Sequence, residues 1–151
     1  VPGPVQDPLP LPYLREGGAE AQTSTPTNYD IHLTVDLLTA GSKTATRICQ
    51  SSLRSMYWSI FQQLAHHTTT GCNMRVGDLC GTGTLSGSTP DSYGSLLELT
   101  WNGANPLTLK DGSTRTFLAD GDTVVLSGYA KGADYTIGFG ECVGTILPAK
   151  E

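Results

Sequence analysis

Glu98 is the residue whose type and setting point most directly to chemistry. It lies in the segment LLELTW, residues 96–101. If this segment is a strand, alternate side chains share a face, so Glu98 follows Leu96 on its own face while Leu97 and Leu99 turn the other way. A carboxylate beside a leucine either faces solvent or is poised inside a cleft, and the pattern leaves both interpretations open.

Thr84 is the second candidate and lies in the glycine-rich segment GTGTLSG, residues 81–87. Glycines let a backbone approach another group closely, and a hydroxyl among them can hydrogen-bond a ligand oxygen. The alternative is a threonine in an ordinary glycine-rich strand.

The other polar candidates favour structural roles. His66 and His67 fall in the last turn of a predicted helix, where an imidazole meets unpaired carbonyls. His32 belongs to the polar face of a predicted strand. Asp120 and Asp122 flank a glycine and could offer oxygens to a hard cation. A turn in which these carboxylates cap backbone amides is the favoured interpretation, since no second acidic cluster accompanies them.

Several function classes lack their signatures. GxSxG, Walker, strand-following GxGxxG and HExxH motifs are all absent. A net charge of −5 disfavours nucleic acid as a partner, and no apolar run approaches the roughly 18 residues needed to cross a membrane. The four cysteines do not have zinc-ligand spacing; they favour reduced cytoplasmic thiols over two disulfides and are Cys49, Cys72, Cys80 and Cys142.

The elements that must position these residues are mostly short strands. With 18 Gly, 9 Pro and only 15% charged residues in 151, the chain favours one turn-rich domain. Hydrophobic alternation predicts strands over residues 29–37, 45–49, 79–86, 96–101, 124–129 and 135–147, with a hairpin over 107–118.

One helix is predicted, because residues 53, 56, 57, 60, 61 and 64 form a single apolar stripe. Ser51 or Ser52 would cap its start, and Gly71 lies just beyond its end. The fold class is therefore mainly β (α+β), with an amphipathic helix covering one sheet. Residues 1–28 are predicted to form a Pro/Gly-rich extended arm and loop, and residues 29–149 the ordered unit, which the resemblance given next implies is the incomplete C-terminal part of a catalytic domain.

Eight segments together resemble the C-terminal part of the fumarylacetoacetase family, within the fumarylacetoacetate hydrolases. The resemblance covers residues 7–149 and departs only over 16–28, which looks like a longer loop. The segments are DPLPLPYL (7–14), MYWSIFQQLAHH (56–67), GCN (71–73), RVGDL (75–79), GTLSG (83–87), YGSLLELTW (93–101), DGD (120–122) and YTIGFG (135–140).

The resemblance implies a mixed β-roll and a C–C bond hydrolase. Water would cleave 4-fumarylacetoacetate into fumarate and acetoacetate, the last step of tyrosine and phenylalanine breakdown. This chemistry needs a deprotonated water, a stabilised oxyanion and an electron sink. The resemblance implies that a divalent cation, Mg²⁺ and/or Ca²⁺, supplies the electron sink. The resemblance also implies a cytoplasmic homodimer, with no nucleic-acid or membrane partner.

The resemblance assigns a role to both candidates. Glu98 matches the glutamate that orients the catalytic histidine, and Thr84 matches a threonine that hydrogen-bonds substrate. That histidine, the cation's carboxylates and the oxyanion-site lysine and arginine belong to an earlier portion, so no metal ligand is assigned among these 151 residues. The chain is expected to be a fragment that is inactive alone, with Glu98 and Thr84 projecting from neighbouring β segments into one hollow.

Two alternatives remain open at this point. One is a related acylpyruvate or diketo-acid hydrolase of the same superfamily. The other is a non-catalytic β module used for assembly.

Overall fold

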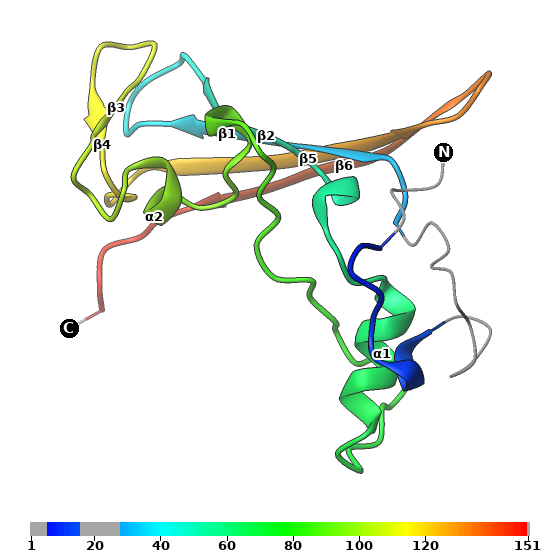
Figure 1. Ribbon diagram of the computed structural model, residues 1–151. Coiled ribbons are helices and arrows are strands. Elements are labelled where there is room, and N and C mark those ends of the chain that lie inside the picture. The colour runs from blue at the N-terminus through cyan, green and yellow to red at the C-terminus, as the bar shows by residue number, and fades with distance from the viewer. Residues whose placement is uncertain (1–5, 16–27, 151) are drawn as a thin grey trace.

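The computed structural model describes residues 6–15 and 28–150, and its main element is a four-stranded antiparallel sheet (Figure 1). The strand order is β2-β1-β5-β6. The strands are β1 (Ile31–Leu38), β2 (Thr46–Ser52), β5 (Thr123–Lys131) and β6 (Thr136–Thr145). A separate two-stranded sheet pairs β3 (Leu107–Thr108) with β4 (Thr114–Arg115). The prediction of a mainly β, α+β chain is confirmed.

The central pair, β1 and β5, has one apolar and one polar face because their side chains alternate. Val35 pairs with Leu126, and Leu37, which is fully buried, pairs with Val124. On the opposite face the Thr34 hydroxyl lies 2.8 Å from that of Ser127. The alternation seen in residues 29–37 thus reports a strand with one wet face, as predicted.

Helix α1 (Ile60–Thr68) begins later than the apolar stripe predicted. Residues 53–55 form instead a 3₁₀ turn, η2 (Leu53–Ser55), with Ser52 as its cap. The capping box of α1 decides the start: the Ser59 hydroxyl accepts from the Gln62 amide, and the Gln62 side chain accepts from the Ser59 amide. Gly71 lies three residues beyond Thr68, the last residue of α1, and has the left-handed conformation that was expected there, with φ 81°.

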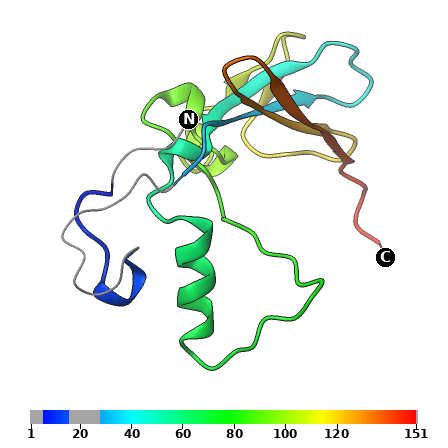
Figure 2. The same ribbon diagram turned by 90° about the vertical axis from the view of Figure 1, so that its right-hand side faces the viewer.

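Helix α1 was expected to cover a sheet, and it does not. Figures 1 and 2 show it standing away from the four-stranded sheet, next to residues 6–15, which include the 3₁₀ turn η1 (Pro12–Leu14). Gln62 and Gln6 exchange side-chain hydrogen bonds of 2.7 and 2.9 Å, and Gln62 also donates to the Leu14 carbonyl. The remainder of the predicted arm, residues 1–5 and 16–27, lies outside the described residues.

Two predicted strands are wrong. Residues 79–86 belong to a loop that leaves α1 and returns toward the sheet (Figure 2) without strand pairing, and Leu79 is fully exposed. Residues 96–101 contain the short helix α2 (Leu96–Leu99), preceded by the 3₁₀ turn η3 (Pro90–Ser92). Ser95 caps α2, and its hydroxyl overrides the strand-like alternation of leucines by accepting the Glu98 amide.

The hairpin predicted over residues 107–118 is confirmed, although its strands β3 and β4 are only two residues each. Gly112 supplies the left-handed residue of its turn, with φ 84°. No helix within the described ranges is long and apolar enough to span a membrane.

Candidate functional site

The Glu98 carboxylate is half-buried and held by two serine hydroxyls. Glu98 is the third residue of α2, not a strand residue as expected. The hydroxyls of Ser86 and Ser95 both donate to its Oε2, at 2.7 and 2.9 Å. A loop and a helix therefore meet at a single carboxylate oxygen.

The loop that carries Ser86 lies directly along the segment that precedes α2. The Gly87 amide donates to the Ser92 carbonyl at 3.0 Å, and the Gly94 amide donates to Ser86 Oγ at 3.0 Å. This approach requires glycine at 94, because a Cβ there would lie 2.5 Å from the Leu85 carbonyl oxygen.

Thr84 lies in the same loop, two residues before Ser86, and is exposed. A Cβ added at Gly94 would lie 2.7 Å from its methyl carbon. No hydrogen bond within residues 6–15 and 28–150 involves its hydroxyl. The loop is thus joined to α2 through Ser86. Glu98 and Thr84 lie on a helix and a loop, not on two neighbouring β segments as expected. A shared hollow for Glu98 and Thr84 remains a prediction.

A cavity of about 240 Å³ lies under α2, against the apolar face of the sheet. Leu96 and Leu99 line it from the helix, and Val35, Val124 and Leu126 line it from the sheet. Neither Glu98 nor Thr84 lines this cavity. Leu96 and Leu99 therefore face the sheet, whereas Leu97 is exposed and Glu98 is directed to the loop.

The three histidines lie on β1 and α1. In α1, His66 Nδ1 is 3.0 Å from the Tyr13 hydroxyl. His32 stacks on Tyr129 with ring centroids 4.8 Å apart. His67 lies in the last turn of α1, as predicted. Within the described part of the chain, none of these rings is hydrogen-bonded to the carboxylate.

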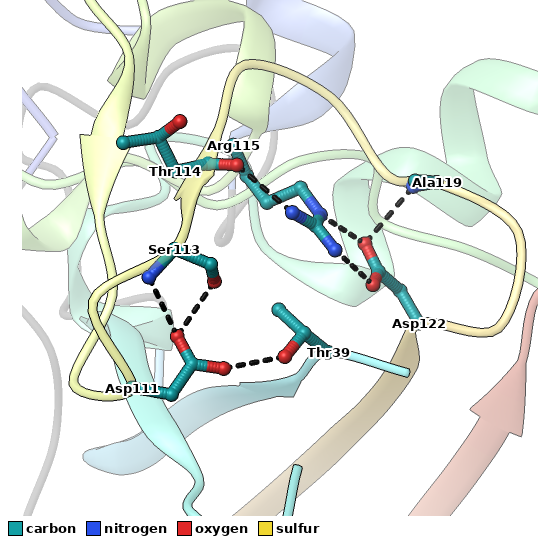
Figure 3. A network of polar contacts seen from close by, with 7 residues as sticks. All are labelled: Thr39, Asp111, Ser113, Thr114, Arg115, Ala119 and Asp122. Carbon is teal, nitrogen blue, oxygen red and sulfur yellow. Dashed lines mark hydrogen bonds and ion pairs between the residues drawn. The ribbon is translucent and has the colours of Figure 1, made fainter. Parts of the chain in front are cut away.

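Asp122 of the D-G-D segment is held by hydrogen bonds and an ion pair (Figure 3). Its carboxylate is fully buried and accepts from Arg115 Nε and Nη2 at 2.7 and 2.9 Å, and from the Ala119 amide at 2.9 Å. These contacts, the Arg115 guanidinium first, hold the pKa of Asp122 below its usual range. Asp122 caps a backbone amide in a turn, as the sequence favoured, whereas Asp120 is exposed.

The described residues do not fit the divalent cation that the family resemblance implies. Across 6–15 and 28–150, no group of three or more His, Cys, Asp or Glu side chains is arranged to hold a metal ion. All four cysteines have free thiols. Cys49 is the buried one, and burial raises the pKa of its thiol.

Sequence reasoning missed Ser86 and Ser95. The spacing Ser95-x-x-Glu98 is the capping-box pattern that opens helices, and it could have indicated both α2 and the first contact of the carboxylate. Nothing local signals Ser86, because twelve residues separate it from Glu98.

Comparison with known proteins gives consistent matches along the whole chain. The sequence model of the family described as "Fumarylacetoacetate (FAA) hydrolase C-terminal" matches residues 18–147. A fumarylacetoacetase from Arabidopsis thaliana is 55% identical over 146 residues, which cover 97% of this chain and 33% of the relative. The human fumarylacetoacetase is 49% identical over 149 residues, 99% of this chain and 34% of the relative. The chain thus spans about a third of the length of the curated relatives it matches.

Proposed function

This chain belongs to the fumarylacetoacetate hydrolase C-terminal family, and on that premise we propose that it serves as the C-terminal part of a fumarylacetoacetase. The reaction is hydrolysis of the C–C bond of 4-fumarylacetoacetate to fumarate and acetoacetate. The observation that carries the proposal is the Glu98 carboxylate, which is fixed by two hydroxyls in a chain about half identical to fumarylacetoacetases.

A fixed carboxylate suits the role of orienting a histidine base. Water attacking a carbonyl must lose a proton, and imidazole is the side chain best matched to accept it near neutral pH. A carboxylate bonded to the far ring nitrogen selects the tautomer and stabilises the imidazolium that forms. Glu98 plays this part for a histidine outside these 151 residues.

The proposal also covers substrate binding, the cation and the oligomeric state. The exposed Thr84 hydroxyl hydrogen-bonds a substrate oxygen. The divalent cation that the family resemblance implies, Mg²⁺ or Ca²⁺, is held by carboxylates outside this chain. The working protein is a cytoplasmic homodimer.

Exposed apolar side chains on the main sheet support a larger assembly. Leu126 on β5 is 47% exposed and Phe139 on β6 is 60% exposed. Such surface is covered in a stable protein by another part of the chain or by a partner. The length of the relatives supplies that further chain in the full-length protein, meaning the longer polypeptide that carries this sequence.

The test compares the 151-residue chain with the full-length protein, following loss of the substrate's diketone absorbance. The full-length protein should cleave 4-fumarylacetoacetate, and the 151-residue chain alone should not. Glu98→Gln in the full-length protein should lower kcat about 10²- to 10⁴-fold. Faster turnover of an acylpyruvate or another diketo acid would reassign the substrate, and activity in the 151-residue chain would overturn the proposal.

A further inference from the structure

We propose that Ser86 is a positioning residue that sets the orientation of the Glu98 carboxylate. The inference rests on the proposed function, since it concerns how the carboxylate that faces the histidine is aimed. The Ser86 hydroxyl acts through Glu98 and needs no contact with substrate.

The direction of the Ser86 hydrogen bond is fixed by its other partner. Ser86 Oγ accepts the Gly94 amide at 3.0 Å. Its single proton is then donated to Glu98 Oε2 at 2.7 Å. A backbone donor from one segment thus orients a hydroxyl that orients the carboxylate of the next.

Both serine hydroxyls donate to the same carboxylate oxygen of Glu98, and this leaves its second oxygen free to accept another hydrogen bond. Ser86 and Ser95 donate to Oε2, while Oε1 of Glu98 has no hydrogen-bond partner among the described residues. Every buried side-chain nitrogen or oxygen in that part of the chain has a partner, so Oε1 is reachable from outside. An anchored oxygen beside an open one is the geometry with which a carboxylate receives an imidazole N–H.

The carboxylate also departs from the usual capping arrangement. In a capping box the third helical residue turns its side chain back to the amide of the cap residue. Here Ser95 Oγ accepts a hydrogen bond from the Glu98 amide at 3.3 Å. The Glu98 carboxylate, however, accepts from the hydroxyls of Ser86 and Ser95 and not from the Ser95 backbone amide. The Ser86 hydroxyl offers the competing donor.

Ser86 is a cleaner test of positioning than Ser95, because Ser95 also caps α2. Ser86→Ala in the full-length protein should lower kcat about 10-fold, a modest loss of alignment, with KM changed less than twofold. Ser86→Thr, which keeps the hydroxyl, should retain most of the parent kcat. Ser88→Ala, an exposed serine in the same loop, is the matched control and should retain the parent kcat.

A double-mutant cycle separates positioning from a purely structural role. If Ser86 acts through the carboxylate, adding Ser86→Ala to Glu98→Gln should lower kcat no further. If Ser86→Ala does not fold, Ser86→Cys, which fills similar space with a weak donor, should show the same non-additive loss.

The outcomes distinguish the two proposals. A parent protein that does not cleave 4-fumarylacetoacetate, or a Glu98→Gln variant as active as the parent, overturns the proposed function. A parent that depends on Glu98 but loses less than twofold in kcat with Ser86→Ala overturns only the role of Ser86. A further 10-fold loss on top of Glu98→Gln does the same.

Discussion

Arg115 and Asp122 form a bidentate ion pair, with Nε and Nη2 lying 2.7 and 2.9 Å from the two carboxylate oxygens. The Asp122 side chain is fully buried and that of Arg115 is 20% exposed. The pair links β4 to the start of β5 and therefore joins the two sheets (Figure 3). Its strength depends on how little water reaches it.

Arg115→Met should destabilise the protein by about 2 kcal/mol, since it leaves a buried carboxylate without its counter-charge. The matched control is Arg47→Met, which breaks a second bidentate pair, with Asp36, of nearly equal length but 40% exposed on the arginine side. That change should cost less than about 1 kcal/mol. Urea unfolding of both variants measures the difference, and equal costs would contradict the burial argument.

Part of the stability that the folded protein loses at low pH should come from protonation of Asp122. Its pKa is lowered in the folded protein, chiefly by Arg115, so its contribution to stability is fully present above the unfolded value of about 3.9. That contribution is lost as the pH falls below this value toward the folded pKa. Between pH 5 and 2, Asp122→Asn should therefore flatten the fall of the unfolding free energy by up to about 1.4 kcal/mol per pH unit. Denaturant titrations at several pH values measure the slope, and an unchanged slope would contradict the assignment.

The strands of the four-stranded sheet could be predicted because alternation is a local property. Residues 31–38 show it plainly, and burial of Leu37 on one face is its physical cause. The two wrongly predicted strands show the limit of this signal. In residues 96–101 a single hydroxyl, that of Ser95, outweighs the alternation. Residues 79–86, with their threonines and leucines, pair with no strand within the described chain.

Other features depend on contacts between distant segments, which periodicity does not carry. The apolar stripe of α1 does not say what the helix packs on. Residues 6–15 contact α1 through hydrogen bonds between Gln6 and Gln62, while the apolar side chains of the stripe within α1 stay exposed. The Glu98 site is similar, because Ser86 reaches it across a loop. Glu98 and Thr84 were candidates from their residue type and setting, the family resemblance assigned their roles, and those roles remain predictions.

The start of α1 at Ile60 predicts unequal effects for two serines that precede it. Ser59→Ala removes the acceptor for the Gln62 amide and should cost about 1 kcal/mol. Ser52→Ala, at the position that the apolar stripe favoured, removes only the cap of a 3₁₀ turn and should leave α1 intact. Amide hydrogen exchange in residues 60–68 measures this directly. Faster exchange with Ser52→Ala than with Ser59→Ala would place the effective cap at the earlier serine.

Gly94 should tolerate no side chain, since the loop carrying Thr84 and Ser86 depends on its close approach. A Cβ at 94 would meet the Leu85 carbonyl oxygen at 2.5 Å and Thr84 Cγ2 at 2.7 Å, and the backbone oxygen cannot move without displacing the loop. Gly94→Ala should therefore cost roughly 1–3 kcal/mol and break the Ser86 contact with Glu98.

The control for this change is Gly81→Ala, at a glycine of the same loop with no atom within 4 Å of the added carbon and no positive φ. It should leave stability and kcat of the full-length protein close to the parent values. Thermal unfolding and turnover of 4-fumarylacetoacetate measure both effects. A Gly94→Ala variant as stable and active as Gly81→Ala would show that the loop does not need this contact with the segment before α2.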